Sequence, residues 1–312
     1  MNLPVVDFSA FNLNENDVVD DQLHVLSKEL KTAFTEIGFV YLKNTGITQE
    51  EVDHVMTMSK NFFLQPEELK QPFSRKSYAV NLNHGWVSLE TERLNPRRPG
   101  DLKEAFNITS LRTDIKWPSS GAATGFKEAH ISFFQHCKEL SLRVLRVMAH
   151  SLDLDPEVFL STHRLIGSEE NDTTLRSLYY PPVSREKVKE GQLRCGEHSD
   201  YGSITLLFQS HEGGLQVLSR SGEYISAPSI PGTVLVNIAD LMQRWTSDLF
   251  VSSVHRVLLP PAGDCITRQS LAFFVHPDTD ALITCIDGSN KYPPVKSGDY
   301  LTERFNDSYG RE

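Results

Sequence analysis

The feature that most constrains the fold is a series of short β-rich segments in the second half of the chain. From about residue 173 onward, runs of branched and aromatic residues alternate with turns that contain glycine and proline. Runs at this spacing are typical of a β-sandwich or barrel, and their turns suit hairpins between the two sheets of a jelly roll. The expected strands are Leu175–Tyr180, Ser203–Gln209, Gly214–Leu218, Thr233–Ile238, Val254–Leu258, Gln269–Val275 and Leu282–Cys285.

The first half of the chain has the periodicity of amphipathic helices instead. Apolar residues recur at helical spacing in residues 20–36 and 127–150, which predicts two long helices packed on a flat surface. Between them, residues 38–42 are typical of a short strand and residues 51–63 of a further helix. Residues 84–125 contain several Pro and Gly with little periodicity, so we expect a long surface loop of the kind that often forms a functional lid.

Composition limits the partners and the location of the protein. The 312 residues are 39% apolar and 23% charged, an ordinary globular profile, and a chain of this length can enclose a deep site. A net charge of −10 without a basic stripe argues against nucleic acid as a partner. No signal peptide or long apolar stretch is present, so we expect a cytoplasmic protein with no membrane span. Most of the cysteines, Cys137, Cys195, Cys265 and Cys285, are expected to be buried, reduced and without a disulfide framework.

Two histidines and an aspartate indicate a metal site. His198 and Asp200 point to the same side of an extended run, and His255 lies in a second β-like run that a jelly roll can bring alongside. These ligands cover one face of an octahedron and leave three positions open, as iron(II) needs to bind a bidentate keto acid and O₂. The spacing alone is weak, because His276-Pro277-Asp278 repeats it without a histidine downstream. Without the residues around them, His198 and Asp200 would be explained equally well as an ordinary histidine and acid.

Arg268 and Ser270 form a candidate carboxylate site further along the chain. Both residues point to one face of a β-like run, and a guanidinium with a hydroxyl suits one carboxylate. This carboxylate would be the distal one of 2-oxoglutarate, whose keto acid chelates the metal. Taken alone, Arg268 is explained more simply as a solvated strand arginine, but its position after the metal ligands favours the binding role.

Together these motifs resemble the isopenicillin N synthase-like family of iron(II)/2-oxoglutarate oxygenases, and the resemblance covers nearly the whole chain. It implies a mainly β fold with flanking helices and a double-stranded β-helix, or distorted jelly roll, as the core. A helical and strand region over residues 1–120 would pack on a catalytic core over residues 121–312 as one integrated unit. The segments that carry the resemblance, besides the metal and arginine motifs, include Leu3–Asp7, Gly38–Ile47, Asp101–Phe106, Tyr179–Pro182, Gly213–Val217, Val236–Asp240 and Gln243–Asp248.

The resemblance also implies roles for single residues. Tyr180 would reach the carboxylate of the co-substrate, although aromatic core packing also explains a tyrosine there. Leu178 stands where many plant members have asparagine, so Arg176 is a candidate for the missing polar contact. Asn237 is expected near the metal but without a catalytic role. Candidate substrate-pocket residues are Arg176 and three residues for which core packing is an equally good explanation, Phe274, Thr205 and Leu207.

The expected activity is oxidation of a small organic molecule with Fe(2+), 2-oxoglutarate and O₂, releasing succinate and CO₂. The outcome would be hydroxylation, desaturation or ring closure. Three alternatives stay open: an iron oxidase of the same family that does not use 2-oxoglutarate, a non-catalytic jelly roll that binds a small molecule, and a zinc hydrolase without the usual HExxH motif. Neither the substrate nor the oligomeric state can be read from the sequence. Arg97 and Arg98 could meet an anionic substrate, although adjacent loop arginines usually face water.

Overall fold

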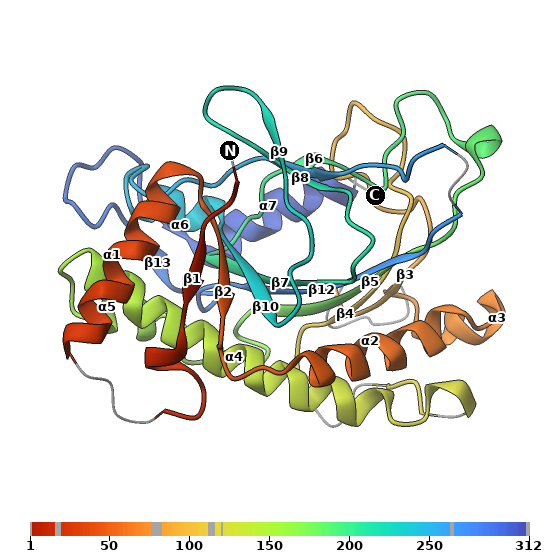
Figure 1. Ribbon diagram of the computed structural model, residues 1–312, viewed down its shortest axis with the longest axis horizontal. Helices are drawn as coiled ribbons and strands as arrows, with labels where there is room; N and C mark the ends of the chain where they lie inside the picture. Colours follow the sequence, from red (N-terminus) through yellow and green to blue (C-terminus); the bar gives the residue numbers. More distant parts are fainter. Residues whose placement is uncertain are drawn as a thin grey trace.

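The computed structural model contains two facing β-sheets, with helices on the outer side of the larger one (Figure 1). It describes residues 2–15, 20–75, 83–111, 116–119, 121–262 and 265–309. The large sheet has the strand order β1-β2-β10-β7-β12-β5-β4-β3, and the small sheet has the order β6-β11-β8-β9. This arrangement confirms the expected mainly β fold with flanking helices around a distorted jelly roll.

The large sheet consists of β1 (Val5–Asp7), β2 (Phe39–Lys43), β3 (Gly85–Val87), β4 (Glu104–Ile108), β5 (Thr174–Tyr180), β7 (Ile204–Gln209), β10 (Thr233–Ile238) and β12 (Arg268–Val275). The small sheet consists of β6 (Cys195–His198), β8 (Leu215–Leu218), β9 (Tyr224–Ser226) and β11 (His255–Val257). The helices are α1 (Asp20–Glu36), α2 (Gln49–Phe63), α3 (Glu67–Lys70), α4 (Phe126–Ser151), α5 (Glu157–Leu160), α6 (Asp240–Trp245) and α7 (Ser297–Tyr309). Short 3₁₀ turns lie at Ser9–Phe11, Gln71–Phe73, Gly121–Ala123 and Arg185–Lys187.

Side chains of the large sheet alternate between a layer under the helices and a layer between the sheets. On β12, Leu271 and Phe273 belong to the core under the helices, whereas Arg268, Ser270 and Phe274 line the space between the sheets. The period of two along a strand produces this division. One strand can therefore contribute apolar residues to the core and polar residues to an internal pocket.

Helices α1, α2 and α4 cover the outer face of the large sheet (Figure 1). On α4, Phe133 packs edge-on against Phe208 of β7 and Phe134 against Phe273 of β12, each with 5.0 Å between ring centroids. Aromatic pairs of this kind stabilise by about 0.5–1.5 kcal/mol beyond the area that they bury. The predicted long helices are thus confirmed. None of the described helices has the length and the apolar character needed to cross a membrane.

The expected surface loop at residues 84–125 is wrong in part. Strands β3 and β4 lie within it and pair antiparallel at the edge of the large sheet, with Trp86 opposite Phe106. Glu104 accepts hydrogen bonds from the Trp86 indole and from the ammonium of Lys70, both at 2.7 Å, so this edge is partly buried. Three-residue and five-residue strands are too short to produce a periodic signal between Pro and Gly residues. Residues 112–115 and 120 of this stretch lie outside the described residues.

Two smaller expectations also need correction. The strand expected at residues 282–285 is reduced to β13 (Leu282–Ile283), which pairs with β14 (Val295–Lys296) in a separate two-stranded sheet. Burial holds for Cys137 and Cys195, whereas Cys265 is exposed and Cys285 is half-buried. A short β-like run such as residues 282–285 does not indicate which sheet it joins. Cys265 and Cys285 lie near turns, and their exposure follows that of the turns.

Arg98 does not face open solvent. Its Nε donates to Glu197 at 2.5 Å and its Nη1 donates to the Gly191 carbonyl at 2.6 Å. The hydrogen bonds to Glu197 hold the pKa of Arg98 above its usual value. Arg98 therefore ties its loop to the strand that ends at His198.

Two buried histidines join the helices to the large sheet. The Nε2 of His130 on α4 lies 3.0 Å from the Ser59 hydroxyl of α2 and 2.9 Å from the Ser177 hydroxyl of β5. The Nε2 of His163 lies 2.8 Å from the hydroxyl of Ser203. Burial lowers the pKa of each histidine to about 4. Both rings are therefore neutral at pH 7.

These histidines should make folding stability depend on pH. An unfolded histidine titrates near pH 6.5, so as the pH falls from 6.5 towards 4 the unfolded chain takes up protons that the folded chain excludes. Each buried ring should cost about 2 kcal/mol of stability between pH 7.5 and pH 5. We expect His130→Gln to be less stable than the wild type at pH 7.5 but to lose about 2 kcal/mol less on acidification. Urea unfolding at both pH values measures this. Exposed His211→Gln is the control, and an equal loss in wild type and His130→Gln would contradict the assignment.

Candidate metal centre and adjoining pockets

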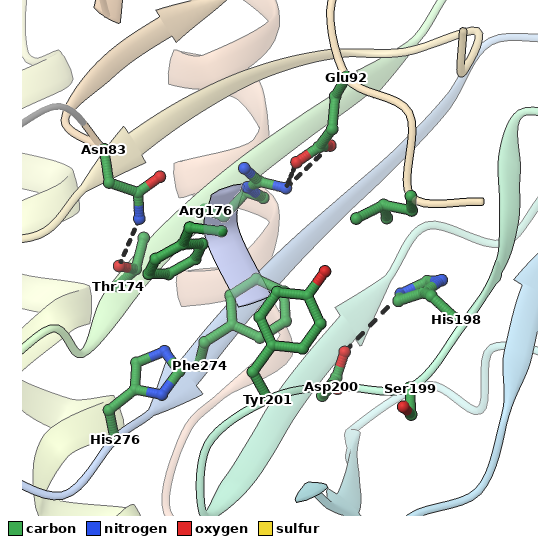
Figure 2. A pocket seen from close by; sticks show the side chains of 12 residues that line it. Asn83, Glu92, Thr174, Arg176, His198, Ser199, Asp200, Tyr201, Phe274 and His276 are labelled. Carbon is green, nitrogen blue, oxygen red and sulfur yellow. Dashed lines mark hydrogen bonds and ion pairs between the residues drawn. The ribbon is translucent and has the colours of Figure 1, made fainter. Parts of the chain in front are cut away.

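His198 and His255 lie opposite each other on neighbouring strands of the small sheet. Strands β6 and β11 are antiparallel with these two residues in register, and the ring centroids are 4.3 Å apart. Oδ1 of Asp200 lies 3.7 Å from His198 Nε2 and 3.6 Å from His255 Nε2. One ligand atom from each residue therefore falls within 4.8 Å of the others. The three residues that the sequence selected are brought together, with His198 and Asp200 side by side in Figure 2.

Backbone carbonyls fix the tautomer of both histidines. Nδ1 of His198 lies 2.8 Å from the Gly196 carbonyl, and Nδ1 of His255 lies 3.1 Å from the Ser253 carbonyl. A carbonyl can only accept, so each Nδ1 carries a proton and Nε2 is the nitrogen that faces Asp200. Burial, helped by the charge of His198, lowers the pKa of His255 to about 4 although Asp200 opposes the shift. This ring is thus in the neutral form that binds metals.

The two oxygens of Asp200 have different environments. Oδ2 accepts hydrogen bonds from the Thr205 hydroxyl and the Asn237 amide, both at 2.7 Å, whereas Oδ1 faces the histidines. Burial alone would raise the pKa of Asp200, but His255, His198 and the two hydrogen bonds lower it. One charged oxygen and two imidazole nitrogens thus converge on one point. This donor set fits a divalent transition metal held on one face.

Two pockets meet at this cluster. The inner pocket runs between the sheets from His255 to Arg268, and the outer pocket continues from His198 past Arg176 to Phe305 on α7. Leu94, Arg176, His198, Asp200 and Phe274 line both pockets. A metal at the cluster would therefore be reached from two sides.

The closed end of the inner pocket contains a buried arginine. Arg268 is 1% exposed, and its Nη2 donates to Gln209 at 2.8 Å. Its Nη1 lies 3.5 Å from the Ser270 hydroxyl, and its Cζ lies 4.7 Å from the centre of the Tyr180 ring. No carboxylate of the described residues forms an ion pair with Arg268, and its Nε is buried without a partner. A solvated strand arginine is therefore wrong for Arg268, and this end of the pocket is suited to an anion.

The outer pocket combines a buried ion pair with aromatic walls (Figure 2). Arg176 Nη1 donates to both oxygens of Glu92, at 3.0 and 3.1 Å, and the Arg176 Cζ lies 5.9 Å from the Phe274 ring centre. Tyr201 and Asn83 complete the walls around them. Arg176 was a candidate for a polar contact with the co-substrate. Its guanidinium is bonded to Glu92, and Arg176 lines both pockets, so the contact with the co-substrate stays a prediction.

Comparison with known proteins agrees with this geometry. Residues 171–277 match the family model of the 2OG-Fe(II) oxygenase superfamily, and residues 3–123 match that of the non-haem dioxygenase in morphine synthesis N-terminal region. UPF0676 protein C1494.01 of Schizosaccharomyces pombe is 33% identical over 310 residues, which are 96% of this chain and 92% of that protein. The chain belongs to the 2OG-Fe(II) oxygenase superfamily. It is an iron(II)- and 2-oxoglutarate-dependent dioxygenase.

Members of the superfamily similar to this oxygenase are named for different small molecules. The crystal structure of a full-length Neurospora crassa protein in complex with alpha-KG and thymine has a TM-score of 0.84 and 34% identity, covering 98% of this chain and 96% of that one. Proline hydroxylase buaE of Petromyces alliaceus is 32% identical, with 82% of each chain covered. Membership therefore establishes the reaction class and a small-molecule substrate, but not which molecule.

When bound, iron(II) with 2-oxoglutarate supplies the chemistry that turns O₂ into an oxidant for a substrate C–H bond. The oxygenase itself contributes two imidazole nitrogens, one carboxylate oxygen and the adjoining pockets. Several of its contributors could not be found from sequence motifs. Glu92 and Asn83 come from a stretch without periodicity, while Tyr201 directly follows the metal motif and could have been suspected. Gln209 was missed because only the strand register brings it to Arg268.

Thr205 was expected on the substrate pocket, and it lines the inner pocket while donating to Asp200. We expect Thr205→Val to weaken metal binding about tenfold, because groups that orient a ligating carboxylate are typically worth 10–100-fold in affinity. Calorimetric titration of the metal-free protein with Mn(II) measures this.

The matched control is Thr233→Val on the distant end of β10, where the hydroxyl donates to the Ile230 carbonyl at 2.7 Å. An unchanged affinity in Thr205→Val, or an equal loss in both variants, would show that the hydrogen bond to Asp200 does not support the metal.

Proposed function

We propose that the dioxygenase holds iron(II) and 2-oxoglutarate through one set of residues between its two sheets. The observation that carries this proposal is the unpartnered guanidinium Nε of Arg268, buried at the closed end of the pocket that opens on the three ligand atoms. Two carboxylate-binding features at opposite ends of one pocket suit a dicarboxylate whose keto acid chelates the metal. The iron ligands are His198, Asp200 and His255, and the residues for the distal carboxylate are Arg268, Ser270 and Tyr180.

Anaerobic reconstitution with iron(II) and 2-oxoglutarate tests these assignments without knowledge of the substrate. We expect a weak visible charge-transfer band that needs both components. His255→Ala should abolish the band through loss of the metal, whereas Arg268→Ala should keep the metal and raise the 2-oxoglutarate concentration needed by at least about tenfold, because it removes a charge-assisted pair. A full band in Asp200→Ala, or normal 2-oxoglutarate affinity in Arg268→Ala, would contradict the proposal.

We further propose that the substrate is a small, uncharged, flat molecule with amide-like N–H and C=O groups. Arg176 and Glu92 of the outer pocket are paired with each other, and Lys103, which lines the inner pocket, is paired with Glu92 at 2.9 Å and with Asp101 at 2.5 Å. Paired charges leave little to attract a charged substrate, because a buried ion would need a counter-ion of its own.

The walls of the outer pocket support the same substrate class. The rings of Tyr201 and Phe274 offer flat apolar faces, and Phe305 adds a third aromatic residue (Figure 2). Asn83 carries an amide, which can both donate and accept, and Glu92 carries a carboxylate, which accepts. Thymine, which the Neurospora crassa relative binds, is a molecule of this class.

Succinate release under air tests the substrate class. We expect pyrimidine bases and related lactams to raise succinate formation above the substrate-free rate, while free amino acids and other carboxylates do not. Phe274→Leu should raise the KM of an active substrate about fivefold, since an aromatic contact is worth roughly 1 kcal/mol beyond area burial. Phe273→Leu, on the helix-facing side of the same strand, is the matched control. Stimulation by carboxylates alone would overturn the substrate class.

We also propose that residues 1–120 and 121–312 fold as one integrated unit. Strands β1 to β4 from the first region and β5, β7, β10 and β12 from the second share the large sheet, which supports this reading. The outer pocket likewise combines Asn83 and Glu92 from the first region with Arg176 from the second.

A further inference from the structure

A second buried arginine lies at the closed end of the inner pocket. Arg194 directly precedes β6 and is 2% exposed. Its Cζ lies 5.9 Å from the centre of the Tyr180 ring, and the Cζ of Arg268 lies 4.7 Å from the same centre. Arg194 does not itself line the inner pocket, whereas the Tyr180 ring that it contacts does.

The guanidinium of Arg194 is poorly satisfied by the protein. Within the described part of the chain its one hydrogen bond runs from Nη2 to the Ile266 carbonyl, and its Nε is buried without a partner. Burial and the neighbouring charge of Arg268 both lower the pKa of Arg194. Two cations near one tyrosine ring, neither of them in an ion pair with a described carboxylate, are costly unless an anion binds between the sheets.

Glu212 is the acidic side chain that competes for Arg194. The negative charge of Glu212 raises the pKa of Arg194, and its Oε2 is buried without a hydrogen-bond partner. Within the described residues, however, no oxygen of Glu212 forms an ion pair with Arg194. The charge of Arg194 is therefore not cancelled locally, and it adds to the potential that Arg268 produces at the pocket end.

We propose that Arg194 is a positioning residue for the distal carboxylate of 2-oxoglutarate, supporting the Tyr180 ring and adding a second positive charge beside Arg268. This inference rests on the proposed co-substrate site and adds a residue that lies outside the Arg-x-Ser motif. The ligand class is specific: Arg194 should strengthen binding only of keto acids that carry a second, terminal carboxylate. A keto acid with an uncharged end would gain nothing from it.

The test compares two keto acids in two proteins. The dissociation constants of 2-oxoglutarate and of 2-oxopentanoate, which lacks the terminal carboxylate, are measured anaerobically with iron(II) through the visible band and confirmed by calorimetry. We expect Arg194→Gln to weaken 2-oxoglutarate about tenfold, the effect of a unit charge roughly 8–10 Å away in a protein interior. Binding of 2-oxopentanoate should change less than about twofold by the same reasoning, since it has no distal charge. Arg194→Lys, which keeps the charge, should restore most of the affinity for 2-oxoglutarate.

The controls separate this effect from a loss of structure. Exposed Arg220, which donates to the Thr35 carbonyl, provides the matched variant Arg220→Gln, and it should change neither constant. Mn(II) affinity should be the same in Arg194→Gln as in the wild type. Equal weakening of both keto acids would assign Arg194 a purely structural role and overturn the inference. Unchanged 2-oxoglutarate binding, together with equal destabilisation by Arg194→Gln and Glu212→Gln, would also overturn it and identify a structural pair. Failure of the wild type to bind 2-oxoglutarate at all would instead reject the proposed co-substrate site.

Discussion

The carboxylate of Asp200 connects the two sheets through hydrogen bonds on one oxygen and contacts with the metal-site histidines on the other. Asp200 follows β6 of the small sheet, yet its Oδ2 is held by Thr205 of β7 and Asn237 of β10 in the large sheet. Its other oxygen faces the two histidines of the small sheet. A buried carboxylate without such donors would be protonated or expelled. The hydrogen bonds therefore determine both the charge of the metal site and its position between the sheets.

Charge in the interior is distributed unevenly between the two pockets. In the outer pocket, Arg176 is matched by Glu92, and Lys103 of the inner pocket is matched by Glu92 and Asp101. At the end of the inner pocket, Arg268 has no acidic partner among the described residues. Because the cost of burying an unpaired ion is several kcal/mol, this difference separates a compartment prepared for an anion from one prepared for a neutral molecule. The metal cluster lies at the boundary between them.

The sequence was informative where residues two apart contribute to one site, within β12 for Arg268 and Ser270 and just past the end of β6 for Asp200. His198 with Asp200, and Arg268 with Ser270, are both spaced by two residues, and local backbone geometry is enough to predict that they act together. It was uninformative where the site depends on which segments become neighbours. Glu92 reaches Arg176, and Asn83 reaches Thr174, only because β4 pairs with β5 at the sheet edge. Gln209 reaches Arg268 only through the register of β7 with β12. Such contacts depend on the tertiary structure, so the periodicity of residues along the sequence does not predict them. The same reason explains why two short edge strands were mistaken for a loop.

The carbonyls of Gly196 and Ser253 have a consequence for metal selection. They hold both imidazoles with Nε2 towards Asp200, so hydrogen bonds of the protein itself orient the donor atoms. Nitrogen and oxygen donors oriented in this way do not discriminate against nickel, copper and zinc, whose intrinsic affinity for such ligands exceeds that of iron(II). Loading with iron must then be decided by the supply of free ions around the protein. The rigidity that orders the site for oxidation also makes it open to occupation by an inert competitor.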